Sequence, residues 1–260
     1  MALAQSARPI EGAVATLGVS DRVTFLRKTY AHLAVALVMF AALTAGMLKC
    51  MTATSYKFST WAIFGPRYNW GIVLAAFMVL GWVADKMARS STSRGVQYFG
   101  LLLAVVGESV ILQPMIWILI VNFSKSTTDW GYNTVPHLDG LAATILTEAV
   151  VITLAIFIGL SAFVFISKKD FSFMKGTLAV LTFAAMGLIV SSLIFGFTLG
   201  AVFSVAIIAL MAGYILYQTS LVMSYFPPQG YVAAALMLFS TIATLFWYVL
   251  RLLMEIYGRR

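Results

Sequence analysis

The stretch "YVAAALMLFSTIATLFWYVLRLL" (Tyr231–Leu253) decides the fold, because it is apolar enough to cross a membrane and yet carries a polar side. A helix needs about 20 mainly apolar residues to cross the hydrocarbon layer. Within and just after this stretch, polar residues recur at helical spacing, at Thr241, Thr244, Tyr248, Arg251 and Glu255. Because a polar face against lipid is costly, we expect this helix to turn that face toward other helices or toward water. The spacing leaves open whether the face forms a hydrogen-bonded seam or lines a pathway.

Apolar stretches of similar length fill most of the chain. Of its 260 residues, 62% are hydrophobic and 10% are charged, whereas soluble domains carry about a quarter charged residues. The sequence therefore predicts an all-α polytopic membrane protein, with a short N-terminal arm over residues 1–24 and one membrane domain over residues 25–260. Seven transmembrane helices are predicted, near 27–49, 69–88, 96–121, 141–167, 176–196, 199–224 and 230–254. Between the fifth and sixth of them, Gly196 and Gly200 predict either a tight turn or a close contact between two helices.

The basic residues lie mainly at the ends of the apolar stretches, which is typical of a membrane protein and argues against a nucleic-acid-binding surface. The net charge is +8. With the N-terminus inside, 10 Lys and Arg residues fall on the inner side and 7 on the outer side. A re-entrant last segment would change that division to 13 and 4. We therefore expect a cytoplasmic N-terminus, and the first 20 residues lack the pattern of a cleaved signal peptide.

Strongly polar residues inside the predicted spans are the candidates for function. Glu108 lies near the middle of the third span and Glu148 in the first half of the fourth, and such residues usually face the bundle interior or a cavity. At the inner end of the second span, Asp85 and Lys86 are expected to form an interfacial pair. Gln218, in the stretch "GYILYQTSLVM", places an amide inside the sixth span. That amide needs a hydrogen-bond partner if it is buried.

Motifs for catalysis are missing from the sequence. The two histidines, His32 and His137, do not form an H-E-x-x-H motif. A single cysteine, Cys50, excludes an internal disulfide and a cysteine-rich metal site. No aspartate follows Lys175, so two late aspartates cannot share a proton as they do in an aspartyl protease. We expect neither an enzyme nor a bound cofactor.

Several stretches together resemble the transmembrane Bax inhibitor motif family: "TEAVV" at 147–151, "ISKKDFSFM" at 166–174, "GYILYQTSLV" at 213–222 and the last predicted helix. "FLRKTYAHLAVAL" at 25–37 resembles the opening of bacterial members. The resemblance implies seven helices, the last surrounded by the other six, and a pH-sensitive calcium leak. It implies a cytoprotective role in eukaryotic members and, in some bacterial members, a link to a membrane protease of the AAA type. For this chain it favours the lipid bilayer of the bacterial inner membrane.

The sequence departs from the family pattern at two positions. The family typically carries an aspartate after "YILY" and another in the last helix, and the pair shares a proton and gates the path. Here these positions hold Gln218 and Thr241. An amide and a hydroxyl do not titrate at ordinary pH, but they can hydrogen-bond to each other. We expect that pH gating at this site is lost or moved, with Glu108 and Glu148 as the remaining buried carboxylates.

Two function hypotheses follow. The first is a cation leak channel, with calcium as the permeant ion and a pathway formed by Gln218, Thr241, Glu108, Glu148, Thr244, Tyr248 and Arg251. The second is a non-conducting regulator that binds a membrane protease or another membrane protein, and the loss of both aspartates favours it more than in a typical family member. A small-solute transporter is a third reading, but no inverted repeat is visible. The sequence leaves metal ligands and oligomeric state open.

Overall fold

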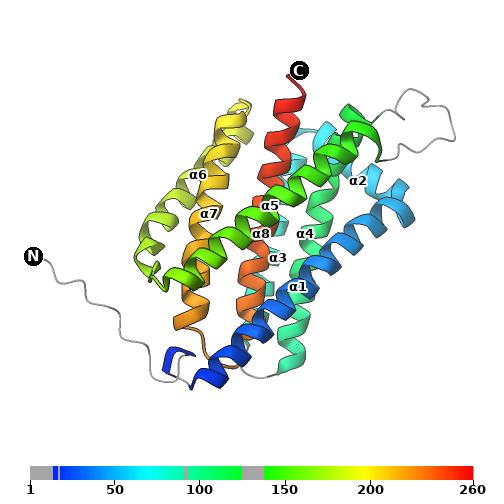
Figure 1. Cartoon of the computed structure of the whole chain (residues 1–260). Helices are drawn as coiled ribbons and strands as arrows, with labels where there is room; N and C mark the ends of the chain where they lie inside the picture. The colour runs from blue at the N-terminus through cyan, green and yellow to red at the C-terminus, as the bar shows by residue number, and fades with distance from the viewer. Residues whose placement is uncertain (1–13, 17, 91–92, 125–137, 260) are drawn as a thin grey trace, which may run out of the picture.

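The computed structural model of the chain describes residues 14–16, 18–90, 93–124 and 138–259. These residues form a bundle of α-helices (Figure 1). The helices are α1 (Val19–Cys50), α2 (Thr52–Phe64), α3 (Arg67–Ala88), α4 (Arg94–Phe123), α5 (Gly140–Ser167), α6 (Lys175–Phe195), α7 (Ala201–Ser224) and α8 (Tyr231–Tyr257). Two short 3₁₀ helices, η1 (Val14–Thr16) and η3 (Ser172–Met174), precede α1 and α6.

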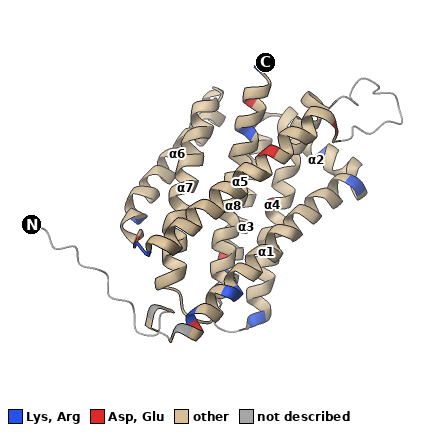
Figure 2. Cartoon of the chain, viewed as in Figure 1, with Lys and Arg blue, Asp and Glu red and all other residues tan. Residues whose placement is uncertain are grey.

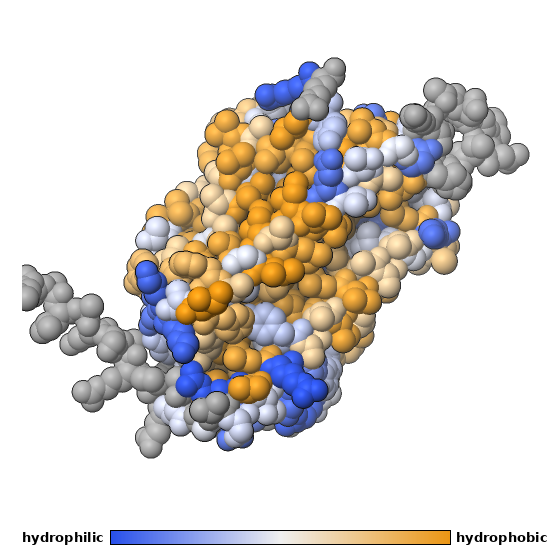
Figure 3. All heavy atoms as spheres, viewed as in Figure 1, coloured by the Kyte–Doolittle hydropathy of each residue, from blue (hydrophilic) through white to orange (hydrophobic). Residues whose placement is uncertain are grey.

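Seven of these helices are long and apolar enough to cross a membrane, namely α1, α3, α4, α5, α6 together with η3, α7 and α8. The seven predicted spans are thereby confirmed. Apolar side chains dominate the middle of the visible face and hydrophilic ones gather toward its ends (Figure 3). The sequence did not predict α2, because its 13 residues fall short of the length that a span requires.

The two ends of the described chain lie at opposite ends of the bundle (Figure 1). α8 is a single helix of 27 residues, about 40 Å long at the rise of an α-helix. A continuous helix of this length does not turn back on itself as a re-entrant segment would. The charged residues gather mainly at the two ends of the bundle (Figure 2). α1 begins at Val19, inside the predicted arm of residues 1–24. Residues 1–13 and 17 of that arm lie outside the described residues.

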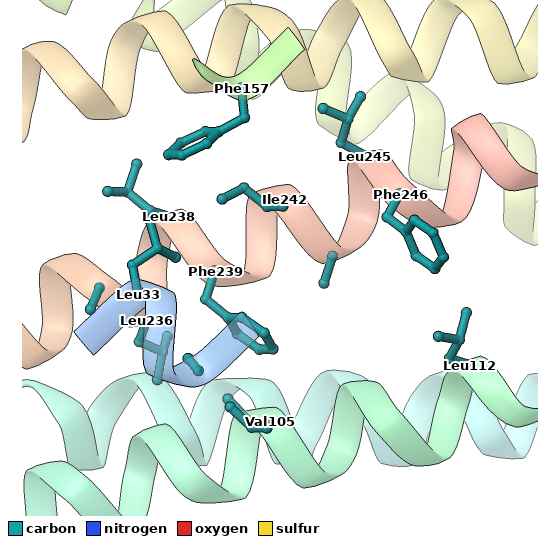
Figure 4. Packing of buried hydrophobic residues seen from close by; sticks show 14 of the residues in the cluster. Leu33, Val105, Leu112, Phe157, Leu236, Leu238, Phe239, Ile242, Leu245 and Phe246 are labelled. Atoms are coloured by element: carbon teal, nitrogen blue, oxygen red, sulfur yellow. The ribbon is translucent and has the colours of Figure 1, made fainter. Parts of the chain in front are cut away.

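Two helices form the centre of the bundle, α4 and α8. In the apolar 18-residue stretch of each, 72% of the residues are buried, compared with 6% in that of α6 and 11% in that of α3. α8 packs against α1, α3, α4, α5 and α7, while α6 packs against α7. Figure 4 shows Phe239 and Leu236 of α8 directed toward Val105 of α4. That all six other helices enclose the last one stays a prediction.

The junction between α6 and α7 is a connection of five residues, 196–200, and both of its glycines lie outside the two helices. Gly196 ends α6 with a φ of +77°, and Gly200 directly precedes α7. A positive φ is accessible to glycine at little cost because it has no Cβ. A Cβ at Gly196 would also meet the guanidinium of Arg67, which would have to move aside.

Asp85 and Lys86 do not pair with each other, contrary to the prediction. Asp85 binds Arg89, with 2.8 Å between Arg89 Nε and the carboxylate. Residues four apart share a helical face, whereas adjacent residues point about 100° apart. Lys86 instead places its Nζ 4.9 Å from the centre of the Trp82 ring, again four residues away.

Candidate functional site

A cavity of about 960 Å³ opens at the end of the bundle where α8 finishes. Its lining residues on α8 run from Glu255 to Thr244, a length of about 16 Å along the helix. α3 and α6 contribute apolar walls, including Trp70 and Leu193. The charged and hydroxyl-bearing residues of the lining are Arg67, Glu108, Ser192, Thr244, Tyr248, Arg251 and Glu255. The cavity therefore brings four of the seven predicted pathway residues together: Glu108, Thr244, Tyr248 and Arg251.

Glu108 is the deepest residue that α4 contributes to this cavity. Among the described residues its carboxyl has neither a hydrogen-bond partner nor an ion-pair partner. The preceding residue, Gly107, lets α3 approach closely, since a Cβ there would lie 2.6 Å from Cδ2 of Leu80. A carboxyl group without a protein partner at the bottom of a cavity is available to a proton, to water or to a cation.

The polar face of α8 serves both of the roles that its spacing left open. Thr241 makes a helix–helix hydrogen bond, while Thr244, Tyr248, Arg251 and Glu255 line the cavity. Arg251 is neutralised at the cavity mouth, because its Nε lies 3.3 Å from Oε1 of Glu255. The Arg251 guanidinium also donates to the carbonyl oxygen of Leu199 in the turn after α6.

Gln218 and Thr241 form a neutral latch between α7 and α8. The Thr241 hydroxyl donates to Oε1 of Gln218 at 2.9 Å, and each residue is only 7% exposed. This contact agrees with the hydrogen bond that the sequence suggested. Neither residue lines the cavity; Thr241 lies one turn beyond Thr244, the last cavity residue on α8. The latch therefore lies beyond the cavity floor, where α7 and α8 are packed together.

Thr219 and Ser220, the two residues after Gln218, contact two further elements. They can do so because successive residues of a helix point about 100° apart. The Thr219 hydroxyl lies 3.5 Å from Oγ of Ser161 in α5. The Ser220 hydroxyl donates to Oδ1 of Asp170 at 3.1 Å, in the segment between α5 and η3. The end of α7 is thus fixed to α8, to α5 and to the segment that leads into α6.

Asp170 accepts hydrogen bonds at both of its carboxylate oxygens. Besides Ser220, its donors are the backbone N–H of Ser172 at 2.8 Å and the hydroxyl of Tyr225 at 3.0 Å. Burial raises the pKa of Asp170, but these hydrogen bonds together lower it by more, so the pKa lies below its ordinary value of 3.8. No role was predicted for this acid, although it lies in the stretch "ISKKDFSFM". It falls between the fourth and fifth predicted spans, whereas the predicted candidates lie inside spans.

Glu148, the other predicted carboxylate, does not line the cavity. It lies on α5 and accepts a hydrogen bond from the Tyr257 hydroxyl, which is 3.0 Å from both carboxylate oxygens. Glu108 and Glu148 therefore do not form one site. Within the described ranges, no group of three or more His, Cys, Asp or Glu residues is placed to hold a metal ion.

The fold and the site define a class of protein: a polytopic α-helical membrane protein with a deep cavity that ends above a buried polar contact between its last two helices. More narrowly, the chain belongs to the family described as inhibitor of apoptosis-promoting Bax1, whose model matches residues 22–257. The resemblance inferred from the sequence is thereby confirmed.

The chain is similar to curated proteins from a yeast, a bacterium and a mammal. It is 30% identical over 245 residues to Bax inhibitor 1 of Schizosaccharomyces pombe, covering 92% of this chain and 79% of that protein. It is 31% identical over 150 residues to an uncharacterized protein of Pseudomonas aeruginosa, covering 55% of this chain and 67% of the other. It is 31% identical over 110 residues to protein lifeguard 4 of Mus musculus, covering 42% of this chain and 46% of that protein. No solved structure matches significantly.

Proposed function

We propose that this protein is a cation leak channel, with calcium as its permeant ion, in which Glu108 attracts the ion at the bottom of the cavity. The observation that carries this proposal is a deep cavity that ends at a carboxyl group without a partner in the described chain. The proposal assigns the protein no catalysis and no bound cofactor. It places the chain in a bacterial inner membrane with a cytoplasmic N-terminus, so that the cavity opens to the outside.

Electrostatics favour a cation over an anion at the cavity floor. Arg251 and Glu255 offset each other at 3.3 Å near the mouth, which leaves Glu108 as the ionisable group at the deep end, able to carry a negative charge when a cation approaches. A carboxylate and a cation 4 Å apart attract by about 4 kcal/mol per unit charge at an effective dielectric constant near 20. The Arg67 side chain lies at the rim, beside Gly196, and not at the depth of Glu108.

The latch closes the path beyond Glu108 in this conformation. For a cation to pass, α7 and α8 must separate and the hydrogen bond between Gln218 and Thr241 must break. Such interhelical hydrogen bonds contribute about 0.6 kcal/mol on average, so breaking this one costs little free energy. Because neither group titrates at ordinary pH, opening at the latch does not respond to pH.

Calcium flux into proteoliposomes tests the proposal. We expect Glu108→Gln to lower flux about ten-fold or more, because the amide keeps the shape of the side chain but removes the charge that attracts the ion. Glu148→Gln is the matched control: it removes the same charge outside the cavity and should change flux less than about two-fold. Equal flux in the wild type and in Glu108→Gln contradicts the assignment of Glu108.

A non-conducting regulator of a membrane protease or another membrane protein is the second candidate. The observation that favours it is the neutral latch itself, which has no titratable group to open it. The same proteoliposomes separate the two functions. A wild-type chain that is folded, yet shows no flux above that of empty vesicles across the pH range, supports the regulator and contradicts the channel.

A further inference from the structure

At the end of the bundle opposite the cavity, three basic side chains surround one tyrosine ring. Lys28 and His32 come from α1, Arg94 is the first residue of α4, and Tyr231 is the first residue of α8. Nζ of Lys28 and Cζ of Arg94 each lie 5.6 Å from the centre of the Tyr231 ring. The centre of the His32 ring lies 5.0 Å away. We call these four residues, together with Tyr98, the basic cluster.

The basic cluster is held in place by buried and hydrogen-bonded groups. Tyr231 is only 4% exposed, and its hydroxyl accepts a hydrogen bond from the Arg94 guanidinium. The Tyr98 hydroxyl lies 3.4 Å from the Tyr231 hydroxyl and 3.2 Å from Nε2 of His32. The ring of His32 also stacks on that of Tyr98, with 5.5 Å between their centres. Arg94 is therefore held beside the ring by a hydrogen bond, and Lys28 contacts the same ring through its ammonium group.

The positive charge of the cluster lacks a negative partner in the described part of the chain. The described residues form two ion pairs, Arg89 with Asp85 and Arg251 with Glu255. Neither pair includes Lys28 or Arg94. Neither α4 nor α8 carries an acidic residue in its first turn, and the N-terminus of a helix adds partial positive charge. Cations placed this close together repel one another, so a bound anion would stabilise them.

We propose that the basic cluster binds the phosphate group of an anionic phospholipid. Arginine and lysine form short, charge-assisted hydrogen bonds to phosphate oxygens, and the tyrosine hydroxyls offer further polar contacts. Basic pockets between transmembrane helices recognise anionic head groups in this way. Lys28 and Arg94 both lie over the Tyr231 ring, so one phospholipid head group can reach both charges.

A lipid fits this position better than a soluble phosphate, because apolar side chains continue from the cluster along the same two helices. Val35 on α1 is 58% exposed, and Phe99 and Leu102 on α4 are 54% and 41% exposed. They lie within about one turn of His32 and Tyr98, on spans whose exposed side chains face lipid. A head group on the cluster therefore places its acyl chains against an apolar surface. This inference does not depend on whether the protein conducts ions.

Lipid binding to the purified, delipidated full-length chain in detergent tests the inference. Native mass spectrometry and the shift in unfolding temperature would compare phosphatidylglycerol, phosphatidylcholine and inorganic phosphate. We expect phosphatidylglycerol to bind most tightly. Because each basic residue contributes about five-fold to the attraction of anionic lipid, Lys28→Gln with Arg94→Gln should weaken that binding roughly thirty-fold.

Arg27→Gln is the matched control, because it removes the same charge from the neighbouring position on α1, which is exposed and has no described contact with Tyr231. It should change binding less than about two-fold. If the double variant does not fold, each single variant should still lose about five-fold. Equal binding of the two lipids, equal losses in Arg27→Gln and Lys28→Gln, or phosphate binding as tightly as phosphatidylglycerol would each overturn the inference.

Discussion

The two halves of α8 differ in how closely the other helices approach them. In the first half, Ala233, Ala234 and Ala235 are at most 3% exposed, and Phe239 is completely buried. In the second half, Thr244, Tyr248 and Arg251 line the cavity. Small residues let helix backbones come close in a membrane, whereas long polar side chains hold them apart. One continuous helix thus forms a closed packing contact in its first half and, on one face of its second half, an open polar wall.

The largest expected effect comes from a core substitution in the closed half. Phe239→Ala should lower the free energy of unfolding by roughly 3 kcal/mol, because the ring packs against Phe40 with 5.7 Å between centres and its removal leaves a void. Unfolding in detergent with increasing denaturant measures the change.

Phe77→Ala is the control, since Phe77 on α3 lines the cavity beside the open half of α8 and its removal only enlarges existing space. We expect a loss below about 1 kcal/mol there. Equal losses at the two positions would show that the two halves are packed alike, contrary to the structure.

Introducing two acids at the latch tests whether the lack of a titratable group there keeps the inner path insensitive to pH. Gln218→Asp combined with Thr241→Asp places two carboxyl groups where the oxygen atoms are now 2.9 Å apart. Two such groups cannot both ionise without repulsion, so the pair shares a proton at low pH and separates as pH rises.

We expect flux through this double variant to rise about ten-fold more from acid to neutral pH than wild-type flux, because the wild type has no titrating group at the latch and responds only through Glu108. Calcium uptake by proteoliposomes at several pH values measures both. Gln218→Asn with Thr241→Ser keeps the latch neutral and serves as the control. A steep pH response in the wild type that is abolished only by changes at Gln218 or Thr241 would contradict the loss of gating at the latch.

The smallest expected effect concerns Asp170, which joins the end of α7 to the segment before η3. Its pKa in the folded chain lies below the ordinary 3.8, so its stabilisation is present above pH 3.8 and disappears as pH falls through the lower, folded-state pKa. Asp170→Asn should therefore lower the unfolding temperature by a few degrees at pH 7. The difference should shrink as the pH falls below 3.8.

Thermal unfolding in detergent from pH 7 to pH 3 follows this change, with Asp85→Asn as the control. Asp85 and Arg89 are 43% and 51% exposed, and such surface pairs contribute little to stability. A constant difference between wild type and Asp170→Asn at every pH would show that the carboxylate charge has no part in the contact.

Length and composition were enough to predict the seven spans, and family positions were enough to predict that Gln218 meets Thr241. The sequence did not indicate α2, the role of Asp170 or the partner of Asp85. α2 is shorter than a span, and the contacts of Asp170 with Ser220 and Tyr225 join residues about 50 positions apart. Long-range contacts of this kind depend on how the helices pack, which local patterns do not report.

The sequence by itself determined that the chain lies in a membrane and that α8 has a polar face, because hydrophobic length and helical spacing are local properties. Only the tertiary structure decided that Glu108 faces a cavity while Glu148 binds Tyr257. Both are single acids in apolar helices, so their sequence surroundings look alike. What distinguishes them is the space between α3, α4, α6 and α8, and that space is set by the packing of whole helices.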